Sequence, residues 1–414
     1  MEMDKKLVFC LLLILGLATS GCWDYQEIND LAIVLAAGVD SHREGGVQLL
    51  VEIAKPEQMA GNGGGGQGSS GKPIEILESV GSTIHQAQRN LHWRSSRDVY
   101  WAHKQVLIIG EDLARQGIAP LLDWFERDHQ ARHSIPLLVT NGPVRNVFQA
   151  QPELESTLAE EIIMLIEHME KQSQGYGTML KDFLHCLSSQ VQHPVTGRLE
   201  VIQKEEPHGG SLAGAGIGGG QGAGGGMEPV PPRALRLAGL AVFKGDRLVG
   251  WLDERETRGF RWIIGEVKGA LVDVTVPGEP QNKVTLEIAR ADSVIIPQVK
   301  GEQLSFTVRV KTQAAIGQYE GTLALSPGLF STLEAACSAV IRKEMEDSLE
   351  RVQREYRVDI FGFGKELRRR YPNVWRKWEG KWDSQFPLLP IEVVVESKIT
   401  NSGLVTSRVP VAQK

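Results

Sequence analysis

Cysteine is scarce in this chain, with four among 414 residues. Cys10 lies in the first apolar segment and Cys22 closely follows it. The other two, Cys186 and Cys337, are far apart in sequence and lie inside helical patterns, so they do not make the disulfide framework of a small secreted domain. We expect both to be buried thiols that pack as small apolar side chains.

The chain also lacks an excess of basic residues, because its formal net charge is −6. A nucleic-acid-binding protein would carry a basic footprint, so no nucleic-acid partner is expected. The sequence contains no Gly-x-Ser-x-Gly nucleophile elbow, no His-Glu-x-x-His helix and no paired metal-binding cysteines. No catalytic, cofactor-binding or metal-binding residue is therefore predicted.

Three patterns approach a functional motif, and each lacks one requirement. Residues 66–72 resemble a phosphate-binding loop, but Pro73 stands where the loop needs a hydroxyl and a free N–H. His129 and His133 have the i, i+4 spacing of a zinc site, without a glutamate or cysteine to complete it. Residues 253–256 hold three carboxylates, but neighbours in one polar turn are not the opposed pair that a glycosidase needs.

The apolar run at residues 7–18 is too short to span a bilayer as a helix, which takes roughly 20 residues. Two lysines precede it and small residues follow it, which predicts a secretory signal peptide over residues 1–21. The small residues and Cys22 resemble a bacterial lipobox, with Thr19 at the position where leucine is usual. Cys22 is then expected to carry a diacylglyceryl and palmitate anchor. The alternative is an ordinary signal peptide with a cysteine near its cleavage site.

The rest of the chain alternates between strand and helix patterns. Runs rich in β-branched residues predict strands at 31–39, 46–54, 99–109, 135–140, 235–243, 248–252, 267–276, 284–296, 304–316 and 391–399. Apolar residues at helical spacing predict helices at 84–92, 157–172, 179–189 and 327–357, and a helical stretch at 110–125. The pattern favours an α/β (α+β-like) multidomain fold, in which mixed β-sheets are flanked by helices.

Two glycine-rich stretches, 61–71 and 209–226, interrupt this pattern. Such composition cannot bury enough apolar surface to offset the entropy of ordering it. The predicted organisation is a signal peptide, an N-terminal α/β region that contains the first glycine-rich loop, a Gly/Pro-rich linker, and a C-terminal α/β region that has room for more than one subdomain. Their bounds are 1–21, 22–205, 206–233 and 234–407.

Five stretches spread over most of the chain share the pattern of one family: Gly21-Cys22-Trp23-Asp24, residues 103–114, residues 237–259, residues 359–364, and Trp375 with Trp382. Together they resemble the Ger(x)C family, the lipoprotein C subunits of the nutrient germinant receptors of spore-forming bacteria. The resemblance implies a non-enzymatic receptor subunit on the outer face of the spore inner membrane (cell membrane). There it would assemble with a multi-spanning A subunit and a transporter-like B subunit. Two alternatives stay open, a solute-binding lipoprotein of an importer and a spore cell-wall hydrolase.

The C-terminal motif supplies the other candidate residues. Asp359, Gly362, Gly364 and Trp375 are expected to form a structural corner in which Asp359 accepts backbone N–H groups. Residues 365–382 carry seven cations against two carboxylates, interleaved with aromatic residues of which Trp375 and Trp382 are expected to pack against the edge of the domain. Five of these cations form a candidate partner surface, and the sequence leaves open whether they face a membrane, a partner or only water: Arg368, Arg369, Arg370, Arg376 and Lys377.

Overall fold

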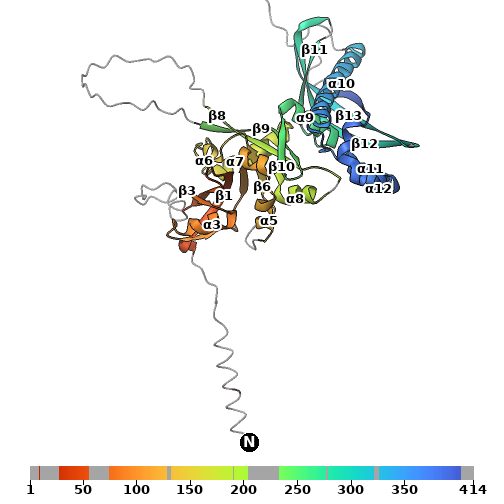
Figure 1. Cartoon of the computed structure of the whole chain (residues 1–414). Helices are drawn as coiled ribbons and strands as arrows, with labels where there is room; N and C mark the ends of the chain where they lie inside the picture. Colours follow the sequence, from red (N-terminus) through yellow and green to blue (C-terminus); the bar gives the residue numbers. More distant parts are fainter. Residues whose placement is uncertain are drawn as a thin grey trace, which may run out of the picture.

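The computed structural model describes residues 28–401 apart from 56–73, 128–131, 190, 204–232, 277 and 321–325, and of the first 27 residues it describes Phe9 alone. Cys22, His129 and both glycine-rich stretches therefore lie outside the described residues. Two β-sheets, each with its own helices, occupy opposite ends of the molecule (Figure 1). We refer to them as the first body and the second body. This is the mixed-sheet, helix-flanked architecture that the sequence predicts.

The first body is built on a ten-stranded mixed sheet in the order β10-β9-β8-β6-β5-β1-β2-β3, with β4 beside β1 and β7 beside β6. The central strands β8, β6, β5 and β1 run parallel, and the strands at both edges run antiparallel. The strands are β1 (Leu31–Ser41), β2 (Val47–Ala54), β3 (Ile74–Gly81), β4 (Asp98–Tyr100), β5 (Val106–Gly110), β6 (Pro136–Thr140), β7 (Thr178–Met179), β8 (Val195–Gln203), β9 (Arg233–Lys244) and β10 (Arg247–Leu252).

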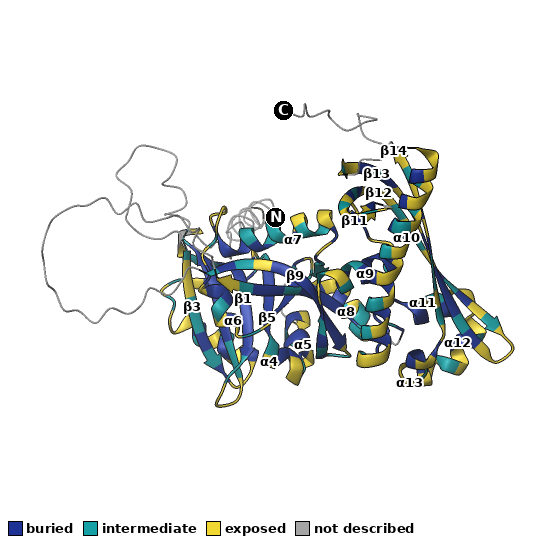
Figure 2. Cartoon of the chain, turned by 90° about the horizontal axis from the view of Figure 1, so that it is seen from above, coloured by how far each residue is buried: buried dark blue, intermediate teal, exposed yellow. Residues whose placement is uncertain are grey.

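Helices cover both faces of this sheet, which is why β1 and β5 are near-continuous apolar runs and do not alternate. Alternate residues of β1 point to opposite faces, so Val39 packs with α3, α4, α5 and α8, and Ala36 packs with α6 and α7. Figure 2 shows the buried strands between these layers. The helices are η1 (Ile28–Asp30), α3 (Ile84–His92), α4 (Glu111–Gln116), α5 (Ala119–Arg127), α6 (Val144–Phe148), α7 (Leu158–Gln172) and α8 (Leu180–Ser188).

One predicted strand is divided in the structure. The sequence predicts a single strand over residues 99–109, and that prediction is wrong: β4 and β5 are separate, although both pair in parallel with the same strand, β1. The chain leaves β1 between them, where Lys104 N–H bonds to Trp101 O (3.1 Å), and Gln105 N–H returns to Leu35 O (2.7 Å). A register irregularity in β1 lies at the same level, between Val34 and Ala36.

The hairpin β9–β10 belongs to the first sheet, although it follows the predicted linker 206–233 in sequence. β9 pairs antiparallel with β8, and Gln203 lies opposite Arg233. The segment 204–232 therefore starts and ends at neighbouring positions of one sheet. The division of the chain into a region 22–205 and a region 234–407 stays a prediction, but the first sheet itself extends across it.

The second body contains a four-stranded sheet in the order β11-β12-β13-β14, in which β14 runs parallel to β13 and the other pairs are antiparallel. β12 and β13 form a long hairpin with alternating burial, which is typical of a sheet with one face on the core. The strands are β11 (Leu271–Val276), β12 (Glu279–Lys300), β13 (Gln303–Tyr319) and β14 (Ile391–Asn401).

Helix α9 (Glu254–Ile264) leads out of the first sheet and packs against α10 (Pro327–Leu349), which also contacts β11 and β14. Most of the predicted helix 327–357 is α10, and a π-helical segment, η3 (Glu350–Tyr356), completes it. The remaining short helices are α11 (Phe363–Arg370), α12 (Pro372–Trp378), η4 (Glu379–Lys381), α13 (Trp382–Gln385) and η5 (Phe386–Leu388). Within the described residues, no helix has both the length and the apolar character needed to cross a membrane.

Candidate functional site

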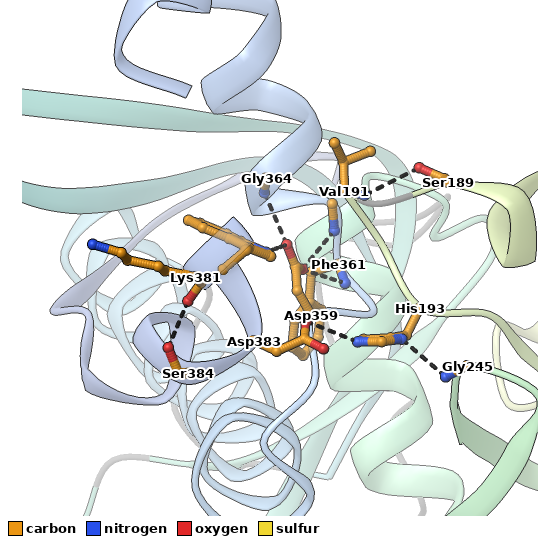
Figure 3. Close-up of polar contacts among 12 residues, drawn as sticks. Ser189, Val191, His193, Gly245, Asp359, Phe361, Gly364, Lys381, Asp383 and Ser384 are labelled. Carbon is orange, nitrogen blue, oxygen red and sulfur yellow. Dashed lines mark hydrogen bonds and ion pairs between the residues drawn. The ribbon is translucent and has the colours of Figure 1, made fainter. Parts of the chain in front are cut away.

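The turn between η3 and α11 is organised by one carboxylate, Asp359, which is 1% exposed. Its two oxygens accept five hydrogen bonds, and Figure 3 shows several of them. The donors to Oδ1 are the backbone N–H groups of Phe361 (3.1 Å), Gly362 (2.9 Å) and Phe363 (3.2 Å), and the donors to Oδ2 are Gly364 N–H (2.8 Å) and Trp382 Nε1–H (3.1 Å). Asp359 thus satisfies N–H groups that the first turn of a helix leaves without an intrahelical partner.

The hydrogen bonds also bear on the charge of this carboxyl group. Burial raises the pKa of Asp359, while the N–H groups of Gly364, Gly362 and Phe363 and the indole of Trp382 act in the opposite direction. A proton on either oxygen would compete with donors already aimed at it, and the N-terminus of α11 adds positive potential. The geometry therefore favours the carboxylate.

The two glycines of the turn have separate reasons to be glycine. Gly362 has φ +85°, in the left-handed region that side chains other than glycine rarely adopt. At Gly364 the limit is space, since a Cβ atom there would lie 2.7 Å from Val191 O and 2.9 Å from Trp382 Nε1. The intervening Phe363 is buried against Phe306, with ring centroids 5.0 Å apart. The backbone turns at the first glycine and closely approaches its neighbours at the second.

His193 joins this turn to the first body. Its backbone N–H donates to Asp359 O (2.7 Å), and its ring Nδ1 accepts from the N–H of Gly245 in the β9–β10 turn (3.1 Å). Because Nδ1 accepts, Nε2 carries the proton and donates to Asp383 Oδ1 (3.1 Å; Figure 3). This bond lowers the pKa of Asp383. One residue, through its backbone and its ring, therefore connects the first sheet, the Asp359 turn and α13.

A cavity of about 380 Å³ lies beside this joint, between the two bodies. Tyr176, Asp182 and Cys186 line it from the first body, and Lys365 and Arg369 line it from the second. Burial raises the pKa of the half-buried Cys186 thiol, so a reactive thiolate is disfavoured there.

Three incomplete motifs were noted in the sequence. Where the structure describes their residues, these residues make contacts that stabilise the fold. Asp253 and Glu256 form a capping box at the start of α9. Glu254 pairs with Arg236 at 3.2 Å. His133 Nε2 lies 3.4 Å from Phe125 O, and the described part of the chain contains no group of three side chains that could hold a metal ion. Residues 66–72 lie outside that part.

Two family models together match most of the chain. "Spore germination protein N-terminal domain" matches residues 24–201, and "Spore germination B3/ GerAC like, C-terminal" matches residues 238–403. The chain is 26% identical over 410 residues to Spore germination protein KC of Bacillus subtilis (strain 168), covering 97% of this chain and 96% of that protein.

The chain belongs to the Ger(x)C family.

Further comparisons extend over comparable lengths. Spore germination protein B3 of Bacillus subtilis (strain 168) is 25% identical over 406 residues, covering 96% of this chain and 98% of that protein. The crystal structure of the GerBC protein has the same fold, with a TM-score of 0.52 and 18% sequence identity, over 88% of this chain and 97% of that chain. The Ger(x)C resemblance seen in the sequence is thus confirmed.

The cationic stretch of this Ger(x)C protein separates into buried rings and exposed cations. Trp375 and Trp382 are each 2% exposed and pack edge to face with ring centroids 5.4 Å apart, so they belong to the core, as the sequence predicts. All five candidate cations are exposed on α11 and α12. Arg369 and Arg370 pair with Glu366, Arg376 bonds to Asn373, and Arg368 and Lys377 make no ion pair within the described residues.

Sequence reasoning missed three residues that connect distant segments: Gln192 and His193 join the two bodies, and Glu344 joins α9 to α10. Gln192 Nε2 donates to Ile360 O (2.8 Å), beside the bond from His193 to Asp359. Glu344 on α10 accepts from Arg258 and from Trp262 Nε1 (2.9 Å), both on α9. No local pattern in the sequence marks these positions, because each partner lies at least 50 residues away.

Proposed function

We propose that this protein is the C subunit of a spore nutrient germinant receptor, anchored by lipid on Cys22 to the outer face of the spore inner membrane. The observation that carries the proposal is the match to Ger(x)C proteins over both halves of the chain. The proposed partners are a multi-spanning A subunit and a transporter-like B subunit. Residues 1–21 are proposed to be removed as the signal peptide.

A non-enzymatic role is part of the proposal. Its support is that the conspicuous carboxylates have structural tasks: Asp253 and Glu256 cap α9, and Asp359 binds the start of α11. The exposed cations of α11 and α12 are proposed to be the surface that contacts a partner subunit. Their neighbours Trp375 and Trp382 hold the two helices on the core.

Replacing Cys22 by alanine is expected to move the protein from the membrane fraction to the soluble fraction. Alanine has no sulfur to acylate, and two acyl chains supply about 0.8 kcal/mol per buried CH₂ group. Fractionation and incorporation of labelled palmitate measure the effect. A Cys186→Ala variant is the matched control and should keep both label and location. A wild-type protein without label would refute the anchor.

The double variant Arg368→Glu/Lys377→Glu is expected to keep the wild-type melting temperature and to lose most co-purification with the two membrane subunits. Neither cation has an ion pair within the described residues, so the fold loses little, whereas reversed charge repels an acidic partner surface. Tagged pull-down from spore membranes measures assembly. Lys300→Glu/Arg309→Glu reverses two exposed charges on the β12–β13 hairpin and is the control. Equal recovery of partners with both variants would exclude α11 and α12 as the contact.

A further inference from the structure

The described chain begins at one end of the first body, beside helix α3. β1 starts at Leu31, which pairs with Asp98 directly after the loop that follows α3. Figure 1 shows the first described residues, in red, beside α3 and far from α11 and α12. Cys22 precedes Leu31 by nine residues, which span at most about 30 Å when extended. A lipid on Cys22 would therefore keep this end of the molecule near the bilayer.

Positive charge gathers at the same end. Residues 79–97 contain three arginines and neither aspartate nor glutamate, in a chain whose net charge is −6. Arg89 and Arg94 are exposed, and neither makes an ion pair within the described residues; Arg94 donates to the backbone oxygen of Glu78 (2.6 Å). The carboxylate of Glu78 is itself engaged by Arg145 at 2.5 Å. Within the described residues, Arg89 and Arg94 thus have no carboxylate partner.

Trp93 stands in the middle of this basic segment. It is 84% exposed, more than any other aromatic side chain of the described residues, whereas Trp101, Trp262, Trp375 and Trp382 are at most 2% exposed. Its backbone ends α3 in a helical conformation, so the ring projects from an ordered element. An indole is apolar with one N–H donor, which suits the boundary between lipid headgroups and acyl chains.

A cavity of about 460 Å³ adjoins the segment. Its polar lining comes from Lys55, Arg94, Ser95, Ser96 and Arg97, and Ala32 near the start of β1 also borders it. The carboxylate in the lining, Glu75, pairs with Lys55 at 2.5 Å. Guanidinium and hydroxyl groups are the donors that bind phosphate oxygens well. The cavity and the exposed ring are therefore suited to two parts of the same lipid surface, its headgroups and its interface.

We propose that the surface formed by Arg89, Trp93, Arg94 and this cavity lies against the membrane and binds anionic lipid headgroups, with the Trp93 ring in the interface. The proposal rests on the lipid anchor of the proposed function. The proposed contact would fix the orientation of the protein relative to the bilayer, which a lipid on Cys22 alone does not fix. The second body, with α11 and α12, then points away from the bilayer surface and is accessible to a partner.

The test uses the full lipidated chain in vesicles whose acyl chains carry bromine, which quenches tryptophan fluorescence at short range. Every chain in the test, including the one called wild type, carries Trp23→Phe, because Trp23 follows the lipidated Cys22 directly and would be quenched whichever surface faces the bilayer. We expect quenching in vesicles with phosphatidylglycerol, and its loss in Trp93→Phe and in Arg89→Glu/Arg94→Glu. The matched control Trp251→Phe, in β10 of the same body, should be quenched as strongly as the wild type. Quenching should also be weaker in vesicles of phosphatidylcholine alone.

Each contrary result has a distinct meaning. Equal quenching of Trp93→Phe and the wild type would overturn the contact by Trp93, and equal quenching in both lipids would overturn binding of anionic headgroups. No quenching of a chain that carries labelled palmitate would overturn the membrane-facing surface and leave the anchor standing. A chain that carries no labelled palmitate would overturn both the lipid anchor and the membrane-facing surface.

Discussion

Asp359→Ala is expected to lower the free energy of unfolding by about 4 kcal/mol, because five buried N–H donors lose their acceptor at once. Domains are stable by about 5–15 kcal/mol, so this loss is a large fraction of the total. Asp359→Asn should also destabilise, since an amide has one accepting oxygen and would turn its NH₂ group toward N–H donors. Denaturant titration of both variants measures the losses.

Asp383→Ala is the matched control for this experiment. It removes a carboxylate of the same joint that is half exposed and bound to His193 alone among the described residues. Exposed pairs contribute about 0–1 kcal/mol, so its midpoint should stay near that of the wild type. If Asp359→Ala also unfolds at the wild-type midpoint, the turn is not held by this carboxylate, and the account of the corner is wrong.

The second large effect is expected at the contact between α9 and α10. Glu344 is 1% exposed and binds Arg258, which also donates to Leu271 O at the start of β11 (3.0 Å). Glu344→Ala leaves the Arg258 guanidinium and the Trp262 N–H without this acceptor in a buried site. Removing one partner of a buried ion pair costs about 3–5 kcal/mol. We expect a loss of unfolding free energy in that range, measured by denaturant titration.

Hydrogen exchange sharpens this second test, because α9 leads out of the first sheet and α10 packs on the second. Loss of Glu344 should speed exchange in α9 and β11, which Glu344 and Arg258 connect, before the rest of the sheets. Asp347→Ala, three residues further along α10, removes only partly exposed pairs with Lys343 and Arg255 and is the control. Unchanged exchange in α9 and β11 would show that Glu344 does not hold α9 against α10.

Local sequence patterns predicted most elements because their causes are local. β-Branched runs predicted β1, β2, β6, β9 and β10 of the first sheet, whereas β3, β7 and the central strand β8 were not predicted. Thr157 caps the predicted helix α7 through Glu160 N–H, which is a local contact. The Asp359 turn is also local, since its backbone donors lie within five residues of the acceptor. The candidate partner surface remains a prediction, but the burial of Trp375 and Trp382 was correctly expected from the sequence.

The sequence by itself determined the type of most elements, the mixed α/β class, the Ger(x)C membership and the glycine-bearing turn at Asp359. Only the tertiary structure decided that β4 and β5 are separate, that β9 and β10 complete the first sheet, that His193 joins the bodies and that Glu344 joins α9 to α10. It also brought the end of the loop after α3 beside the start of β1. The physical reason is that turns, caps and alternation act over a few residues, whereas the pairing of distant strands and of buried charges depends on how the whole chain packs.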